Sequence, residues 1–207
     1  MPMSDSSSVP PATTADDEPP DDVTQSWSRH AKLLAYGVAS GVLFGIGLIL
    51  TEPIGEVAVD VDFKPFVIPY VLIAINRFGL ATMSVGLGAA LGEGVLDIFE
   101  GYELDDPIGF LGYFVGFTVF GWYLHAVADD PTRARSLIIG ATLGAFVQAC
   151  FEASAFLVFE SSAGPGDAII STVGNTITHG ILLGAIPLVV LLQSLPMLAA
   201  RVETAGG

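Results

Sequence analysis

The fold is decided by residues 31–51, AKLLAYGVASGVLFGIGLILT, a run in which Lys32 is the single charged residue. About 20 apolar residues, at about 1.5 Å per residue in a helix, cross the roughly 30 Å hydrocarbon core of a bilayer. The chain of 207 residues is 52% hydrophobic with a mean hydropathy of +0.66, which is too apolar for one soluble core. We therefore expect an all-α integral protein that crosses the cell membrane several times.

Five further apolar segments follow this run, and together they predict six transmembrane helices. The second segment has about 13 residues, which is marginal for a membrane core, and Pro69 interrupts it. Whether this segment crosses fully stays open from the sequence. The predicted spans are about 31–51, 65–77, 79–98, 107–127, 134–159 and 168–192, within a membrane domain of residues 28–201.

Residues 1–27 are rich in Ser, Pro, Thr and Asp and contain no lysine or arginine. A secretory signal needs a basic start and an apolar core, so we expect a disordered acidic tail here and a second short tail at 202–207. The net charge of −15 repels nucleic acid and argues against a nucleic-acid role. Only two lysines occur, a bias that resembles the proteins of salt-loving archaea.

The basic residues orient the predicted helices. With the N-terminus inside the cell, Lys64 is the only basic residue that falls outside. This orientation puts the acidic connections after the first, third and fifth spans outside and both termini in the cytoplasm. The basic residues on the cytoplasmic side are then Arg29, Lys32, Arg77, Arg133, Arg135 and Arg201.

Small residues recur at every fourth position of the first run, at Gly37, Gly41 and Gly45 and again at Ala35 and Ala39. Such spacing lets helix backbones approach closely, and ordinary packing within the bundle explains one such ladder. Two ladders on adjoining faces are more than one neighbouring helix needs. A contact of Ala35, Gly37, Ala39 and Gly41 with a partner protein is therefore a second expectation.

Three predicted spans carry two polar residues four positions apart, which places each pair on one helix face. A charge inside the membrane costs about 2.5 to 3.5 kcal/mol, so each group needs a partner, water or a ligand. Counted from the predicted helix ends, the pairs share the outer half of the membrane, and Gln148 would form the floor of a site. The alternative is that the groups bond one another as interhelical contacts. The candidate substrate-binding residues are Glu93, Asp97, Gln148, Glu152, Asn175 and His179.

Motifs of catalysis and metal binding do not occur in the sequence. There is no HExxH, GxSxG, cysteine pair or phosphate loop, and His179 alone offers too few ligands for zinc. A retinal pigment would need a lysine within a span, whereas Lys64 falls at the end of one. We therefore expect neither an enzyme nor a metal site. The lone Cys150 can form no disulfide within the chain.

The pattern resembles an S component, the substrate-capturing membrane subunit of an energy-coupling-factor (ECF) transporter for vitamins and related micronutrients. The resemblance rests on six spans with cytoplasmic termini and on Ala35 and Ala39 in the first span. It rests also on the glycine-rich stretch RFGLATMSVGLGAALGEGVLDIFEGYELDDPIGFLGYFVGF, residues 77–117.

The resemblance implies capture of a vitamin-like molecule from the outer face, without chemistry. It implies delivery with a membrane T component, contacted through Ala35 and Ala39, and with two cytoplasmic ATPases, so that ATP is used by these partners and no cofactor is bound by this chain. Two other functions stay open, a stand-alone small-solute transporter or channel and a structural membrane protein without ligand. The substrate, the oligomeric state and the protonation of His179 are not readable from the sequence.

Overall fold

The computed structural model describes residues 22–55, 61–76, 78–159 and 164–194, and every regular element within these ranges is a helix, as expected. The predicted tail does not extend to residue 27, because helix α1 already begins at Asp22; residues 1–21 and the tail at 202–207 lie outside the described ranges. The elements are α1 (Asp22–Thr51), the short 3-10 helix η1 (Glu52–Ile54), α2 (Val67–Ala74), α3 (Leu80–Glu100), α4 (Asp106–Trp122), the π-helical η2 (Tyr123–Val127), α5 (Ala134–Phe159), α6 (Pro165–Asn175) and the π-helical η3 (Thr176–Ala185).

Five helical stretches are long and apolar enough to cross a membrane. Their outward surfaces carry large apolar side chains, such as Ile46 on α1, Leu91 on α3 and Ile138 on α5, all exposed in the isolated chain. Exposed apolar surface of this extent is what lipid contact requires, and it is consistent with a multi-pass membrane protein. The five stretches are Trp27–Ile54, Leu80–Glu100, Asp106–Val127, Ala134–Phe159 and Pro165–Ser194.

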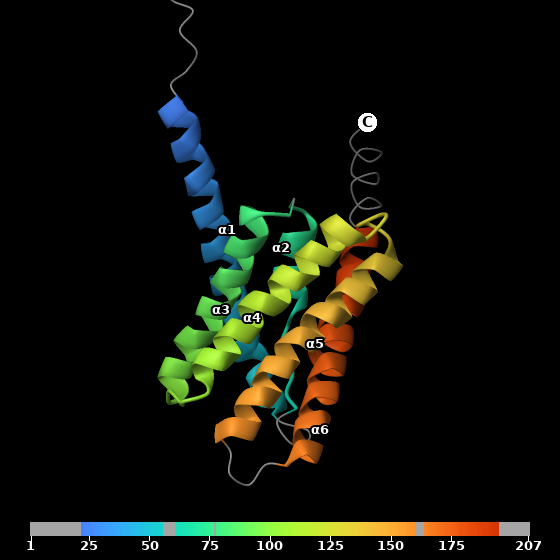
Figure 1. Cartoon of the computed structure of the whole chain (residues 1–207). Coiled ribbons are helices and arrows are strands. Elements are labelled where there is room, and N and C mark those ends of the chain that lie inside the picture. Colours follow the sequence, from blue (N-terminus) through green and yellow to red (C-terminus); the bar gives the residue numbers. More distant parts are fainter. Residues whose placement is uncertain (1–21, 56–60, 77, 160–163, 195–207) are drawn as a thin grey trace, which may run out of the picture.

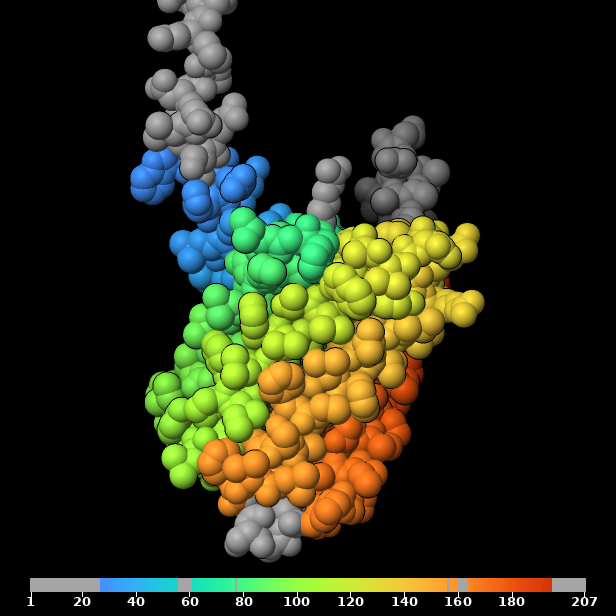
Figure 2. Space-filling view, viewed as in Figure 1, coloured from blue at the N-terminus to red at the C-terminus, as the bar shows by residue number. Residues whose placement is uncertain are grey.

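The long helices pack side by side in the order α1, α3, α4, α5 and α6 (Figure 1). Helix α1 begins at the same end of the bundle at which the last described helical turns finish, and we call this the proximal end. The α3–α4 connection lies at the opposite, distal end. Side chains of α3, α4 and α5 fill the face that Figure 2 presents.

The second predicted span is only partly helical. Helix α2 has eight residues, Val67–Ala74, and it follows a non-helical stretch of residues 61–66. Together these residues, which we call the central segment, lead from the distal end of α1 back to the proximal start of α3 (Figure 1). The prediction of a helix over the whole of 65–77 is therefore wrong, because only Val67–Ala74 are helical. The described chain still passes an even number of times between the two ends of the bundle.

The central segment can leave the helical form because other helices enclose it. Helix α2 contacts α1, α3, α4 and η3, and Phe66, Tyr70 and Ile73 are fully or almost fully buried. Non-helical backbone is tolerated at membrane depth only where protein or a polar cavity shields it from lipid. The surrounding helices therefore shield this stretch of backbone from lipid.

Aromatic rings hold the central segment in place. The ring of Phe66 lies 4.9 Å from Phe117 and 6.1 Å from Phe44, measured between ring centroids. Tyr70 stacks at 4.2 Å on Phe120 and donates a hydrogen bond of 2.8 Å to the carbonyl of Ala141 on α5. Edge-to-face and tilted pairs of this kind add to the area that the rings bury. The rings form a compact layer between the central segment and α1, α4 and α5.

Glycines bring α1 and α3 into direct backbone contact. A Cβ atom added to Gly88 would overlap the carbonyl of Gly37, and one added to Gly41 would lie 2.6 Å from the carbonyl oxygen of Gly88. Gly37 and Gly41, which the sequence suggested for a partner protein, thus face α3 of the same chain. Ala35 is exposed and Ala39 is half-buried, so a partner contact at these two residues stays a prediction.

This contact predicts that Gly88→Ala lowers thermal stability in detergent by several degrees. The added methyl would force α1 and α3 apart, at a cost of about 1–3 kcal/mol. Gly94→Ala on the same helix is the matched control, because the nearest atom to its added methyl is Phe110 Cδ2 at 3.8 Å. Equal melting temperatures for the two variants would contradict the close packing of α1 on α3.

Candidate functional site

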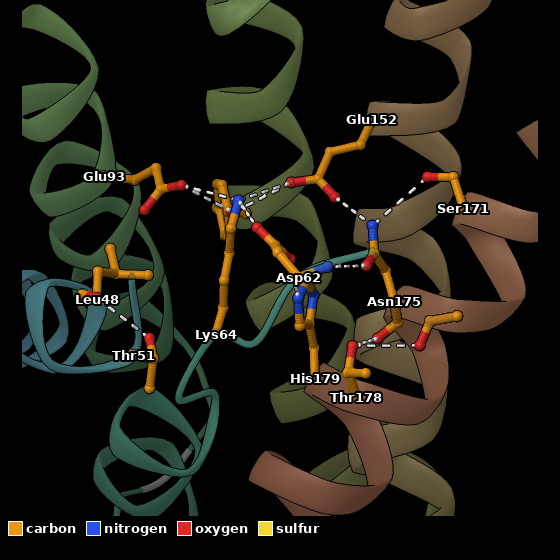
Figure 3. A network of polar contacts seen from close by, with 12 residues as sticks. Leu48, Thr51, Asp62, Lys64, Glu93, Glu152, Ser171, Asn175, Thr178 and His179 are labelled. Carbon is orange, nitrogen blue, oxygen red and sulfur yellow. Dashed lines mark hydrogen bonds and ion pairs between the residues drawn. The ribbon is translucent and has the colours of Figure 1, made fainter. Parts of the chain in front are cut away.

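Lys64 lies at the centre of a group of polar side chains near the distal half of the bundle (Figure 3). Its ammonium is 3.0 Å from Glu93 on α3, 3.1 Å from Asp62 and 3.4 Å from Glu152 on α5. The side chains of Lys64, Glu93 and Glu152 are only 18%, 12% and 15% exposed. The sequence analysis placed Lys64 at the end of a span and gave no indication of this burial. One lysine joins α3 and α5 to the central segment.

Tyr113 on α4 completes the surroundings of this ammonium. Lys64 Nζ donates a hydrogen bond of 2.5 Å to the Tyr113 hydroxyl and lies 5.2 Å from the centroid of its ring. The hydroxyl itself is 3.1 Å from one carboxylate oxygen of Glu93 and 3.1 Å from one of Glu152. Its single hydrogen can be donated to only one of them at a time. Tyr113 therefore links the two carboxylates that share the lysine.

Asp62 carries the network on to α6. Its carboxylate lies 2.5 Å from Nε2 of His179, and its backbone N–H donates to the side-chain oxygen of Asn175 at 3.2 Å. The Asn175 amide nitrogen in turn donates to Glu152 at 3.4 Å. Asn175 thus replaces a backbone partner that the non-helical central segment lacks, and it connects that segment to α5. The bond satisfies the backbone N–H of Asp62, and buried backbone N–H groups are costly when they are left without a hydrogen bond.

His179 stands in a widened part of the last helix. Residues Thr176–Ala185 form a π-helix, in which the N–H of Ile186 bonds to the carbonyl of Ile181, five residues earlier. Pro187 follows directly and has no N–H to offer to an α-helical turn, so the wider turns precede a proline. The His179 ring is fully buried and lies 4.8 Å from the Phe66 ring. Helix widening, proline and ring contact together set the position of His179 opposite Asp62.

Two cavities adjoin the Lys64 ammonium and share Lys64, Glu93 and Asp97 in their walls. The larger cavity has a volume of about 310 Å³ and the smaller one about 160 Å³. The larger is also lined by Leu48, Thr51, Glu52, Gly55, Asp62, Phe63, Leu96 and Glu100. The smaller is also lined by Asp105, Asp106, Gly109, Phe110, Tyr113, Glu152 and Ala155.

The structure brings together four of the six predicted site residues, namely Glu93, Glu152, Asn175 and His179. Asp97 is not bonded to them but lines both cavities.

Gln148 lies elsewhere, because its Cβ faces Gly116 on α4. It is fully buried, and neither atom of its amide has a hydrogen-bond partner among the described residues. The expectation that Gln148 forms the floor of the site does not match this position, since the side chain is outside the lining of both cavities.

Sequence reasoning did not include Asp62, Lys64 or Tyr113 among the candidate site residues. Helical spacing could not indicate Asp62 and Lys64, because the stretch that carries them is not helical. The available signal was charge: Glu93 and Glu152 needed a cation at their depth, and Lys64 was the one basic residue that the predicted orientation placed on the same side of the membrane.

Among the residues that the structure describes, no three His, Cys, Asp or Glu side chains are arranged to hold a metal ion. The group around Lys64 is instead a network of hydrogen bonds and ion pairs with open space on two sides. Such a network can bind a polar or charged small molecule and exchange its partners, without a bound metal.

Comparison with family models, with curated proteins and with solved structures finds no match to this chain. The resemblance to S components therefore rests on the residues of this chain alone. Its function has to be argued from the geometry around Lys64.

We expect Lys64→Met to lower the free energy of unfolding by about 3 kcal/mol, because Asp62, Glu93 and Glu152 would keep their charges without a cation. Thermal or denaturant unfolding of the purified protein measures this loss. The double variant Lys64→Met/Glu93→Gln should regain part of it, because one of the repelling charges is removed.

Lys32→Met is the matched control for this experiment, because Lys32 is exposed on α1 and its loss should cost less than about 0.5 kcal/mol. If Lys64→Met and Lys32→Met were equally stable, Lys64 would not be the charge that holds the cluster together.

Proposed function

We propose that this chain is the substrate-binding membrane subunit of an importer, of the S-component type, and that it captures a small molecule at the distal end. The observation that carries the proposal is the Lys64 network itself. It joins charged and polar groups of the central segment, α3, α4, α5 and α6, and its members Lys64 and Glu93 line both adjoining cavities.

A purely structural network would be expected to balance its charges. Removing charges from water is costly, and replacing a buried ion pair by apolar residues is often neutral or stabilising. Here Asp62, Glu93 and Glu152 share the one ammonium of Lys64, so the network holds more negative than positive charge. Polar groups kept at this cost, beside open volume, are more readily explained by binding than by stability alone.

The size of the larger cavity supports a small-molecule ligand. Ligand pockets in proteins commonly measure about 300–1,000 Å³, and about 310 Å³ falls at the lower limit of this range. Leu48, Leu96 and Phe63 supply apolar surface in the same lining as the carboxylates. A vitamin-sized molecule with both apolar and polar parts would suit such a lining.

The proximal half of the bundle supports capture over free passage. Buried rings of Phe66, Tyr70, Phe117 and Phe120 pack against one another on the proximal side of Lys64. A channel would need a continuous polar path through this layer. Release toward the cell therefore calls for a movement of the protein, and the resemblance supplies its source in a T component and two ATPases that use ATP.

An apolar groove between α1 and α3 offers a place for the T component. It has a volume of about 540 Å³, and Leu34, Val38, Leu87 and Leu91 are among the residues in its wall. Ala35 and Ala39 lie on the same helix, and their small side chains would let a partner helix approach.

The proposed orientation has both termini in the cytoplasm and the distal end outside the cell. In a Cys150→Ala background, Leu104→Cys in the α3–α4 connection should react with a membrane-impermeant maleimide on intact cells. Thr132→Cys in the α4–α5 connection should react only after permeabilisation. Both residues are exposed, so unequal burial does not account for a difference. Labelling in the reverse order would overturn the orientation, and labelling of both on intact cells would contradict the crossing by α4.

Native mass spectrometry of the full chain, purified in lipid nanodiscs, tests the proposed function. We expect a small molecule that is released on denaturation. Glu93→Gln should lose this molecule and keep a cooperative thermal transition, because Glu93 lines both cavities and contacts Lys64. The matched control Asp129→Asn changes an exposed carboxylate in the α4–α5 connection and should retain the ligand.

A structural role without ligand is the second candidate, and one observation favours it. Lys64, Asp62, Asn175 and Tyr113 bond one another within the described chain, so much of the network needs no further partner. This candidate predicts that no small molecule is released from the wild-type protein, and that Glu93→Gln changes stability only.

A further inference from the structure

The walls of the two cavities carry a large excess of negative charge. Lys64 is the one basic side chain among the described residues that line them. The potential in such a cleft, between walls of low dielectric constant, attracts cations and repels anions. The carboxylates in the two walls are Glu52, Asp62, Glu93, Asp97, Glu100, Asp105, Asp106 and Glu152.

Lys64 does not offer a free positive charge to an anionic ligand. An ammonium has three N–H groups, and four oxygen atoms already lie within reach of Lys64 Nζ, from Asp62, Glu93, Glu152 and Tyr113. A carboxylate or phosphate ligand would have to displace one of these oxygens. It would also have to enter against the remaining negative charges.

Asp97 is the carboxylate that is left over. It lines both cavities and is half-buried, yet its side chain makes no hydrogen bond or ion pair within the described part of the chain. Its neighbour one helical turn earlier, Glu93, contributes an oxygen to Lys64 and leaves its carboxylate in the same walls. A bound cation would supply the partner that this carboxylate lacks among the described residues.

The chain also shows how these walls hold an alkylammonium. The Lys64 side chain is an ammonium on an apolar stem, and it is received by carboxylates of α3 and α5 and by the ring of Tyr113 on α4. Carboxylate oxygens together with an aromatic face are a common environment for organic cations. Metal binding is not favoured, because no three ligands among the described residues converge on one point.

From these observations we infer that the larger cavity binds a small organic cation, with its ammonium group on Asp97 and Glu93 and its apolar part against Leu48, Leu96 and Phe63. The inference rests on the proposed function and narrows it to a substrate class. Lys64 fixes the adjoining carboxylates and marks the inner limit of the site.

Three probes of matched shape test the charge: benzylammonium, benzyl alcohol and benzoate, added at millimolar concentration and constant ionic strength to the full chain in nanodiscs. Benzylammonium should raise the melting temperature progressively as its concentration rises above the dissociation constant, because a ligand of the folded state stabilises it. Benzyl alcohol and benzoate should give no comparable shift. An equal or larger shift with either of them would overturn the inference.

The variant Asp97→Asn locates the site. It keeps the shape of the side chain and removes its charge, and we expect it to weaken benzylammonium binding by about tenfold or more, since a half-buried ion pair is stronger than an exposed one. Asp129→Asn is the matched control on the proximal side and should bind as the wild type does. Unchanged binding in Asp97→Asn would overturn the assignment to Asp97.

The inference and the proposed function can fail separately. If mass spectrometry finds a released molecule that is neutral or anionic, the cation assignment is wrong and the binding function stands. Absence of any stabilisation by benzylammonium also overturns the cation assignment, whatever mass spectrometry finds. If no molecule is released but benzylammonium stabilises the wild type and not Asp97→Asn, the cation site is supported and the importer function loses its main support.

Discussion

The ion pairs of Lys64 are the interaction on which the rest of the structure depends. The central segment carries this lysine into the bundle, and Glu93 of α3 and Glu152 of α5 meet it there. These contacts join the two sides of the helix row through one atom, Nζ. Without them, the carboxylates of Asp62, Glu93 and Glu152 would lie close together at this depth without a lysine to balance their charge. The aromatic layer around Phe66 then closes the same segment from the proximal side.

The same arrangement accounts for the separation of the molecule into two halves with different properties. On the distal side the walls are acidic and enclose open volume, whereas on the proximal side buried aromatic rings pack against one another. A site that is open toward one end and closed toward the other can capture a molecule but cannot pass it on while the packing is kept. The close backbone contact of α1 and α3 makes this part of the bundle resistant to small adjustments, so the proposed release of a ligand would call for a larger movement.

Much of the fold was predictable, and the reason is the bilayer. Hydrocarbon demands about 20 apolar residues for each crossing helix, and such runs are visible without any knowledge of tertiary contacts. One group of site residues was also predictable, namely Glu93, Glu152, Asn175 and His179. Polar side chains four residues apart on an apolar helix lie on one face, and inside a membrane they need other polar groups as partners. Gln148 shows the limit of that reasoning, since depth along a helix does not give the direction of a side chain around it, and this one faces Gly116.

The sequence by itself determined that the chain is helical, that its helices are apolar enough for a membrane, and which carboxylates lie within them, because these properties depend on composition and local spacing. Only the tertiary structure decided that residues 61–66 are not helical, that Lys64 is buried among carboxylates, and that Gly37 and Gly41 face α3. The physical reason is that a non-helical stretch has no sequence period of its own. Its path and its partners follow from the shape of the space that the surrounding helices leave and from the charges that they point into it.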